Sequence, residues 1–377
     1  MTGKWQQNGG IMSIRSRIGN ATWIVFACIA IFIVLSTAWI RRTYGVLPLA
    51  MVDESFRGGL INKRTLFAKH VVLPTIVIFF ILLTVHITLK KLNRRIITYI
   101  TAILMVLSVC IAAVGLDVGF YLSRQYRMNQ EQWYDIDNVI VHALGSIDNC
   151  VYTNSKEALE NSYKNGSRLF ECDLILTSDG QIAACHDWES WNRETYVDNS
   201  EDMGYIPTLE VFMNSKIMGK YTPLSGTDIV LFMKEHPDVY IITDTKYGEP
   251  DKVTEQFQML VDAAVENDCG ETLDRFVVQI YHAYMYDIVE SIYPFPNYVF
   301  TLYGEGYRGE AEKMTEYAEY CMLRNIDVIT MNEMYYHDEL LDICNRYDIR
   351  MFVHTVNNQD EIQSFREKGI GVYTDNS

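Results

Sequence analysis

The stretch Phe170–Asp187 reads FECDLILTSDGQIAACHD and suggests both a fold and a chemistry. Glu171 and Asp173 stand two residues apart in a run of strand-forming residues, so both carboxylates point to the same side. A Ser-Asp-Gly turn at 178–180 and a second short apolar run then lead to His186. This arrangement can hold a hard divalent cation beside an acid/base group. An ordinary hairpin with polar flanks would show the same pattern, so the rest of the chain must decide.

Charged residues divide the chain into two parts. Residues 1–140 carry 15 Lys or Arg against 6 Asp or Glu, whereas residues 141–377 carry 17 against 42, within a net charge of -16. A domain as acidic as the second part argues against nucleic acid, whose phosphates require basic patches, and makes a bound cation plausible. We therefore expect a basic N-terminal domain and an acidic C-terminal domain that binds no nucleic acid.

Three uncharged apolar runs lie in the first third of the chain, at about 21–40, 70–89 and 96–116. Each has about 20 residues, the length that a helix needs to cross roughly 30 Å of hydrocarbon. The first run could pass for a signal peptide, but no small-residue cleavage site follows it and Arg41-Arg42 close it. We therefore expect residues 1–128 to be an anchor with three transmembrane helices, in a multi-pass protein of the cell membrane.

Basic residues between these runs indicate an orientation. The tight loop Lys90–Arg95 is the densest basic cluster and should be cytoplasmic, which places the C-terminal domain outside the cell. The basic residues of the first loop favour the opposite orientation. The eight cysteines show no zinc-like CxxC spacing and no evident disulfide framework, so they do not decide between the two.

From residue 138 onward, short apolar strands alternate with amphipathic helices. The strand candidates are Val139–Ala143, Leu169–Leu176, Tyr240–Thr243, Phe276–Ile280, Tyr298–Leu302, Val328–Met331, Met351–Val353 and Gly371–Tyr373. Helices are expected at Ser155–Asn165, Thr227–Glu235, Lys252–Glu266, Ala283–Ser291, Glu310–Arg324, His337–Arg346 and Asn358–Lys368. Eight strands in about 240 residues fit a closed (β/α)8 TIM-type barrel better than an open sheet. Segment 188–225 has no regular period, and we expect it to be a loop inserted within a barrel domain at 129–377.

Barrel enzymes carry their chemistry at the C-terminal ends of the strands. Polar or ionisable residues follow nearly every strand candidate on that rim: His142, Glu171, Asp173, His186, Asp244, Lys246, Gln279, Tyr281, His282, Asn332, Glu333, His354, Asn357 and Asp375. An active site explains this collection of polar residues at the strand ends better than chance does.

Taken in order, these motifs resemble the glycerophosphodiester phosphodiesterases, within the wider phosphatidylinositol-phospholipase-C-like barrel group. The resemblance covers about residues 138–377. Its motifs are His142, Thr153-Asn154-Ser155 at a helix start, FECDLILTSDG with His186-Asp187, Thr222-Pro223-Leu224, TDTK with Asp244 and Lys246, HTVN at His354–Asn357 and a closing TDNS. Ordered motifs over a whole barrel are more specific than any one alone.

The resemblance implies a hydrolase that cleaves glycerophosphodiesters to an alcohol and glycerol phosphate. Glu171, Asp173 and Asp244 would ligate one divalent metal, Ca²⁺ or Mg²⁺, since all three offer oxygen. His142 and His186 would form the acid/base pair, one taking the proton of the attacking hydroxyl and the other protonating the leaving alkoxide.

Other residues would support this chemistry. Lys246 would contact the phosphate or a metal-bound carboxylate as a further catalytic residue. The candidates for substrate binding are Asp187, Trp188, Gln279, His354 and Asn357. Asp187 could also orient a neighbour, simple packing is an alternative role for Trp188, and a structural role is an alternative for His354.

Two departures from the family pattern concern the substrate. Ala143 stands after His142 where the family has arginine, so Lys246 or the metal must hold more of the phosphate charge. The third ligand is Asp244 where the family has glutamate, and both features also resemble sphingomyelinase-D-type relatives. Two alternatives therefore stay open: a phospholipase D or C-like enzyme acting on phospholipids or lysophospholipids at a membrane, and a non-catalytic barrel that binds a phosphate ligand.

Overall fold

The computed structural model describes residues 132–195 and 204–376, together with residues 80, 83, 84, 87 and 103–105. The chain divides into two compact units, Met1–Asn129 and Gln130–Ser377. Apart from those few residues, the transmembrane helices expected at 21–40, 70–89 and 96–116 lie outside the described residues.

The prediction of a multi-pass cell-membrane protein with an extracellular catalytic domain is wrong. Within the described part of the chain, no helix is both long enough and apolar enough to span a bilayer. The longest helix there, α10 (Pro250–Glu266), has 17 residues and carries charged side chains along one face. A span requires about 20 predominantly apolar residues, and α10 instead uses its apolar face to pack within the domain.

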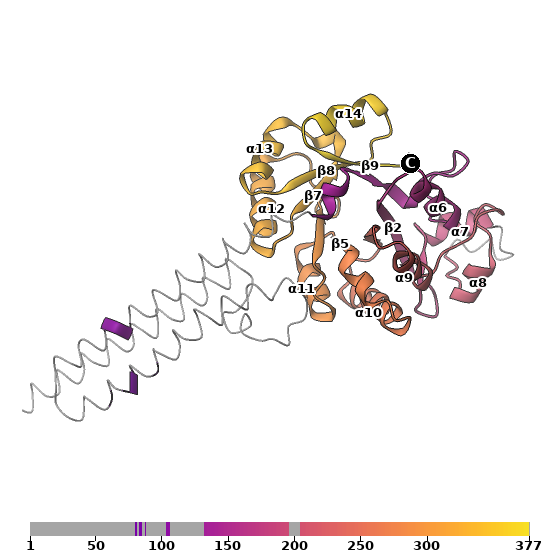
Figure 1. Cartoon of the computed structure of the whole chain (residues 1–377), viewed down its shortest axis with the longest axis horizontal. Helices are drawn as coiled ribbons and strands as arrows, with labels where there is room; N and C mark the ends of the chain where they lie inside the picture. The colour runs from indigo at the N-terminus through magenta and orange to yellow at the C-terminus, as the bar shows by residue number, and fades with distance from the viewer. Residues whose placement is uncertain are drawn as a thin grey trace, which may run out of the picture. The chain divides into compact units, whose positions relative to one another are not determined.

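Eight parallel strands close into a barrel in the second unit (Figure 1). They are β1 (Val139–Val141), β2 (Leu169–Leu176), β4 (Tyr240–Thr245), β5 (Phe276–Ile280), β6 (Asn297–Thr301), β7 (Val328–Asn332), β8 (Arg350–His354) and β9 (Gly371–Thr374). Pairing of β1 with both β2 and β9 closes the ring. Strand β3 (Ile182–Ala184) adds antiparallel to β2 as a hairpin. The predicted TIM-type barrel is confirmed, and all eight strand candidates are present.

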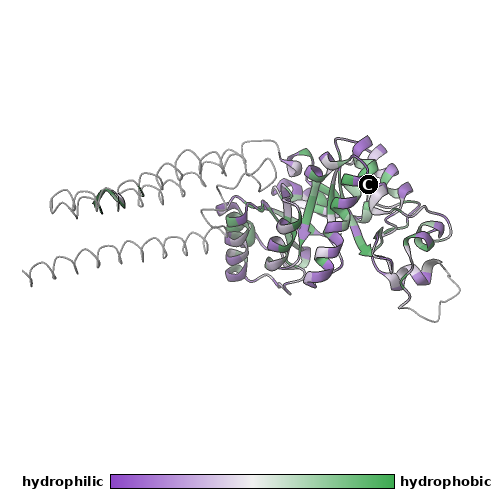
Figure 2. Ribbon diagram, turned by 90° about the horizontal axis from the view of Figure 1, so that it is seen from below, coloured by the Kyte–Doolittle hydropathy of each residue, from purple (hydrophilic) through white to green (hydrophobic). Residues whose placement is uncertain are grey.

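Helices alternate with these strands. They are α5 (Trp133–Ile136), α6 (Lys156–Lys164), α7 (Trp188–Thr195), α8 (Leu209–Asn214), α9 (Gly226–Glu235), α10, α11 (Ala283–Ile292), α12 (Ala311–Arg324), α13 (Asp338–Arg346) and α14 (Gln359–Glu367), with 3-10 turns η3 (His142–Leu144), η4 (Gly270–Arg275) and η5 (Glu333–Tyr335). Side-chain caps set several starts: Ser155 accepts the N–H of Ala158, and Ser225 and Asp228 form a capping box. Figure 2 shows hydrophobic strands in the middle of the domain and hydrophilic residues on the surrounding helices.

Two layers of side chains explain how the barrel builds a site. One inward residue per strand forms an apolar layer: Ile140, Leu169, Ile242, Val277, Val299, Val328, Phe352 and Tyr373. Trp133 and Tyr134 of α5 pack against this layer. The residues two positions further along are all polar: His142, Glu171, Asp244, Gln279, Thr301, Thr330, His354 and Asp375. Because side chains alternate along a strand with a period of two, a polar ring lies directly above the apolar layer at the C-terminal rim.

The segment 188–225, expected to be an irregular loop, contains the short helices α7 and α8. Trp188, Trp191 and Phe212 from these helices form a small core with Ile175 of β2 and Cys185 after β3. The aromatic rings are 5.8 to 6.0 Å apart between centroids. This satellite core stabilises two helices whose sequences are too short to show a clear helical period.

Candidate active site

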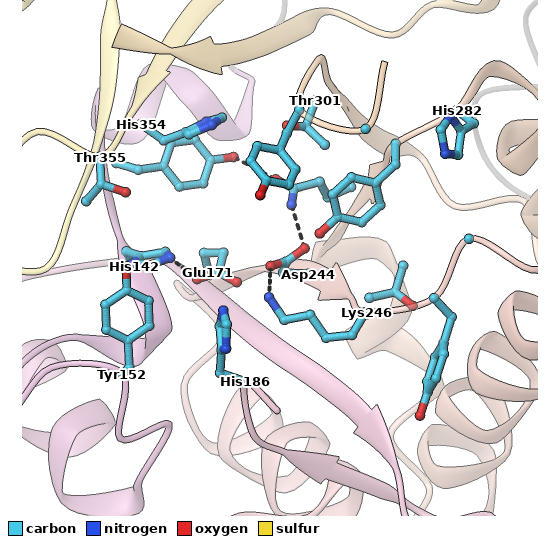
Figure 3. A pocket seen from close by; sticks show the side chains of 18 residues that line it. His142, Tyr152, Glu171, His186, Asp244, Lys246, His282, Thr301, His354 and Thr355 are labelled. Atoms are coloured by element: carbon cyan, nitrogen blue, oxygen red, sulfur yellow. Dashed lines mark hydrogen bonds and ion pairs between the residues drawn. The ribbon is translucent and has the colours of Figure 1, made fainter. Parts of the chain in front are cut away.

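Three carboxylates meet at one point of the C-terminal rim. Asp173 of β2 and Asp244 of β4 are direct partners in the register of these neighbouring strands. Glu171 precedes Asp173 by two residues and therefore points to the same side. Ligand oxygens of the three lie within 4.8 Å of one another, and all three residues are buried. Glu171 and Asp244 point into the same cavity in Figure 3.

Backbone and amide donors hold two of these carboxylates in place. The N–H of Ala143 donates to Glu171 Oε2 at 2.7 Å, so the position where the family has arginine acts here through its main chain. Asn154 Nδ2 donates to Asp173 Oδ2 at 2.7 Å, and Asn154 Oδ1 accepts the N–H of Asp173 at 3.1 Å. Ala143 and Asn154 have left-handed backbones, with φ of 47° and 46°. These bends aim both donors at the carboxylates.

The electrostatics of this cluster fit a divalent cation. Burial and the nearby charge of Asp173 raise the pKa of Glu171 to about 8, and burial also raises the pKa of Asp244. Glu171 Oε1 is buried without a hydrogen-bond partner, which is costly for a carboxylate oxygen. Lys246 Nζ contacts Asp173 Oδ1 at 2.5 Å and also Asp244, but it supplies one positive charge to three acids. A hard divalent ion would satisfy the remaining charge and the unpartnered oxygen.

His142 is held from both sides. Its Nδ1 lies 2.7 Å from Asp375 Oδ1, and its Nε2 lies 3.7 Å from Glu171 Oε2. Burial opposes the charged imidazolium, but Glu171 and the hydrogen bond to Asp375 outweigh burial and raise the pKa of His142 to about 9. Asn357 Nδ2 donates to Asp375 Oδ2 at 2.6 Å, and Asn357 Oδ1 accepts the N–H of Asp375 at 2.9 Å. The imidazole therefore has a fixed orientation.

His186 faces the same cavity from the end of the β2–β3 hairpin. Its Nδ1 lies 2.7 Å from Asp187 Oδ2, and Asp187 also accepts the N–H of Ser190 at 2.7 Å. The ring of Tyr152 stands edge-on to both histidines, with centroids 4.7 Å from His142 and 5.5 Å from His186 (Figure 3). Each histidine thus has a carboxylate on Nδ1, which leaves Nε2 for proton transfer.

A cavity of about 540 Å³ lies above the carboxylates. His142, Tyr152 and His186 line one end, and Figure 3 shows His282 at the opposite end with Asp244 and Lys246 between. Cavities of about 300–1,000 Å³ are typical of small-molecule sites. The space is therefore sufficient for a small diester.

Two of the predicted substrate-binding residues line this cavity. Gln279 Nε2 donates to Asp244 Oδ1 at 2.9 Å, and Gln279 Oε1 accepts the hydroxyl of Tyr373 at 3.3 Å. His354 also lines the cavity, and burial lowers its pKa to about 4. Gln279 therefore positions a carboxylate, whereas His354 is a neutral part of the lining.

Of the other three, Asp187 contacts His186 Nδ1 at the edge of the site, and the remaining two lie elsewhere. Asn357 binds Asp375 and does not line the cavity. Trp188 is buried in the satellite core, where its Nε1 donates to the carbonyl of Leu176 at 3.2 Å. The structure thus brings together both histidines, the three carboxylates, Lys246 and Gln279, and gives Trp188 a packing environment.

Three residues of the site had no assigned role in the sequence. Asn154 and Asp375 belong to recognisable motifs, but their partners Asp173 and His142 are 19 and 233 positions away along the chain. The pairing of β1 with β2 and with β9 brings these two pairs together. Tyr152 could not be singled out as a site residue from the sequence, because it is one of 25 tyrosines in the chain.

Comparison with known proteins identifies this arrangement. Residues 145–377 match the glycerophosphoryl diester phosphodiesterase family. A crystal structure from Silicibacter pomeroyi described under that family name is 14% identical, with a TM-score of 0.52, over 63% of this chain and 89% of that one. A glycerophosphodiester phosphodiesterase structure from Galdieria sulphuraria is 13% identical, with a TM-score of 0.51, over 63% and 92%. No curated protein matches the chain. These two structures share the barrel fold, and with the family match they lead to one conclusion: the chain belongs to the glycerophosphoryl diester phosphodiesterase family and is a phosphoric diester hydrolase.

Proposed function

We propose that this chain is a metal-dependent hydrolase that cleaves glycerophosphodiesters to an alcohol and glycerol phosphate. The observation that carries the proposal is the meeting of two chemistries in one cavity. A buried three-carboxylate cluster lies beside two histidines, each held at Nδ1 by a carboxylate. Membership of the family supports the reaction class.

The carboxylates Glu171, Asp173 and Asp244 would hold one divalent cation, Ca²⁺ or Mg²⁺. When bound, the cation would draw in the phosphate and offset the negative charge that develops during displacement. Lys246 pairs with Asp173 and Asp244. Among the described residues that line the cavity, Lys246 is the only Lys or Arg, so it is the side chain best placed to replace the family's arginine at position 143.

The two histidines would exchange the protons. One would take, at its Nε2, the proton of the attacking hydroxyl of the glycerol moiety, and the other would protonate the departing alkoxide oxygen, which gives the alcohol and a cyclic phosphate. Water would then open the cyclic phosphate to glycerol phosphate, with the two histidines in exchanged roles. Asp375 and Asp187 keep the Nδ1–H of their histidines engaged, which fixes the tautomer that exposes Nε2. The proposed reaction thus needs both imidazoles, in complementary protonation states.

The test is hydrolysis by the purified full-length chain of glycerophosphocholine, glycerophosphoinositol and lysophosphatidylcholine, each with EDTA, Ca²⁺ or Mg²⁺. We expect metal-dependent release from the two water-soluble diesters, and loss of that release in His142→Ala. Release from the lipid alone would instead favour a phospholipase D-type activity. No turnover of any substrate, with metal binding retained, would contradict the proposal and favour a binding role.

A further inference from the structure

Three consecutive barrel strands are each followed by a tyrosine that lines the cavity: Tyr247 after β4, Tyr281 after β5 and Tyr303 after β6. The proposed reaction uses none of them. Because the ends of neighbouring parallel strands meet at one rim, these rings collect on the side of the cavity away from the histidine pair. We call these three residues, with His282 and Glu305, the tyrosine end.

Side-chain contacts tie the loops of the tyrosine end together. His282 Nδ1 lies 2.9 Å from Glu305 Oε1, which joins the loops after β5 and β6. The ring of Tyr284 stacks on His282 with centroids 5.2 Å apart, and its hydroxyl donates to the carbonyl of Gly248 at 2.8 Å. The loop after β4 is thereby joined to the same group. The surface is built from fixed elements, which limits the entropy lost when a ligand binds.

Charge at the tyrosine end is negative. None of the described residues that line it is Lys or Arg. The neighbouring cations face other partners: Lys246 pairs with Asp173 and Asp244, Arg308 stacks over Tyr335 at 5.0 Å, and Lys252 pairs with Glu255 at 2.7 Å. The carboxylate of Glu305 lies directly behind His282. An anionic group would therefore be repelled here and a cationic one attracted.

We propose that the tyrosine end is a subsite for a substrate alcohol that carries an ammonium group. The face of an aromatic ring attracts cations, and quaternary ammonium groups are commonly bound by several such rings. Tyr303 is 74% exposed, so its ring is available to a ligand, while Tyr247 is fixed by a 3.0 Å hydrogen bond from the N–H of Leu176. The inference rests on the proposed function, since it assigns the alcohol of the same diester.

The first experiment compares glycerophosphocholine with the neutral diester glycerophosphoglycerol in the full-length chain. Tyr303→Leu removes the ring but keeps apolar bulk, and Tyr303→Phe keeps the ring as a matched control. Cation–π contacts of this kind correspond to about a three- to thirtyfold change in binding. We expect Tyr303→Leu to raise KM for glycerophosphocholine by that factor with kcat nearly unchanged, little change for glycerophosphoglycerol, and recovery in Tyr303→Phe.

A binding measurement separates this inference from the proposed function. Choline and its uncharged isostere 3,3-dimethylbutan-1-ol differ in charge and hardly in shape, and calorimetry can measure their binding without catalysis. We expect choline to bind more tightly than the isostere, and Tyr303→Leu to remove the difference. Equal binding of the two, or an equal KM change for both diesters, would overturn the subsite. Absence of hydrolysis with choline binding retained would count against the proposed function alone.

Discussion

The two ends of the cavity are built on different principles. Around the carboxylates, side chains are fixed by short hydrogen bonds, such as those of Asn154 to Asp173 and of Asp375 to His142. At the tyrosine end, three tyrosines line the space and Tyr303 is largely exposed. The first arrangement suits a reaction that is the same for every phosphodiester, whereas the second suits a substituent that differs among substrates. Substitutions at the two ends should therefore affect different kinetic constants.

The largest effect is expected from Glu171→Gln. This change removes one negative charge from the cation cluster and leaves the side-chain shape unchanged. Because charge stabilisation of this kind supplies several kcal/mol, we expect kcat to fall about a thousandfold or more at saturating Ca²⁺. Glu305→Gln makes the same chemical change at the tyrosine end, and there we expect a higher KM for glycerophosphocholine with kcat within about twofold. Similar losses of kcat in Glu171→Gln and Glu305→Gln would contradict the claim that the two ends of the cavity have different roles.

Next in size is the difference between two histidines of the polar ring. His142→Ala should lower kcat by about 10²- to 10⁴-fold, which is typical for loss of a general acid or base. His354→Ala should lower it less than about tenfold, because the low pKa of His354 keeps it neutral and its Nδ1 contacts a threonine hydroxyl at 3.1 Å. Steady-state kinetics with glycerophosphocholine measures both. An equal loss of kcat in the two variants would contradict the assignment of proton transfer to His142.

A smaller effect is expected from Asn154→Gly, which keeps the left-handed backbone and removes the amide that holds Asp173. Loss of such a supporting contact typically costs about 10- to 100-fold in metal affinity or activity. Asn325→Gly is a matched control, since Asn325 is also buried and left-handed, with φ of 55°, but it ends α12. Metal titration of both variants should show weaker binding only in Asn154→Gly. Weakening of equal size in the control would indicate a general loss of stability.

The smallest effect is a pH-dependent gain of stability from the cation. In the cation-free protein the pKa of Glu171 is raised from 4.5 to about 8 and that of His142 from 6.5 to about 9. Both groups therefore hold protons in the folded state that they lose on unfolding. The stability of the cation-free protein therefore falls as pH rises from about 4.5 to about 9.

A bound cation takes the place of the proton on Glu171 and disfavours the charged imidazolium of His142, which lies 3.7 Å from Glu171. The increase in Tm produced by Ca²⁺ over EDTA should therefore grow between about pH 6 and pH 9, by a few degrees for a domain of this size. Thermal unfolding followed by fluorescence at several pH values measures this. A Ca²⁺ effect that is constant or shrinks with pH would show that the cation does not bind at Glu171. Glu171→Gln should show little pH dependence of the effect.

The fold could be predicted from the sequence because its signals are local. Short apolar runs and the amphipathic stretches between them indicate the eight strands and the main helices, and the predicted helix bounds differ from the observed ones by no more than two residues. Short helices α7 and α8 were not predicted, since the contacts of Trp188 and Phe212 that stabilise them are tertiary. The membrane localisation failed for a different reason. It rested on the apolar runs at 21–40, 70–89 and 96–116, which lie almost entirely outside the described residues, and among the described residues no helix is long and apolar enough to cross a bilayer.

The site could be predicted where its residues lie on neighbouring strands. Glu171, Asp173 and Asp244 lie at strand ends in the sequence, the family resemblance implied that they form one set, and the parallel register brings them together. The contacts of Asp375 with His142 could not be predicted, since they require closure of the barrel between its first and last strands. Asn357 was expected to bind substrate, and the structure instead shows it positioning Asp375 at the end of the neighbouring strand β9.

The measurement that tests the account most directly is a titration of activity with bound metal. The full-length chain, stripped with EDTA, is titrated with Ca²⁺ or Mg²⁺, and hydrolysis of glycerophosphocholine is measured at each number of bound equivalents. One cation at Glu171, Asp173 and Asp244 predicts a rate that rises linearly to one equivalent and then stays constant, with no rise in Glu171→Gln. Full activity in the stripped protein, or a rise that persists in Glu171→Gln, would contradict the account.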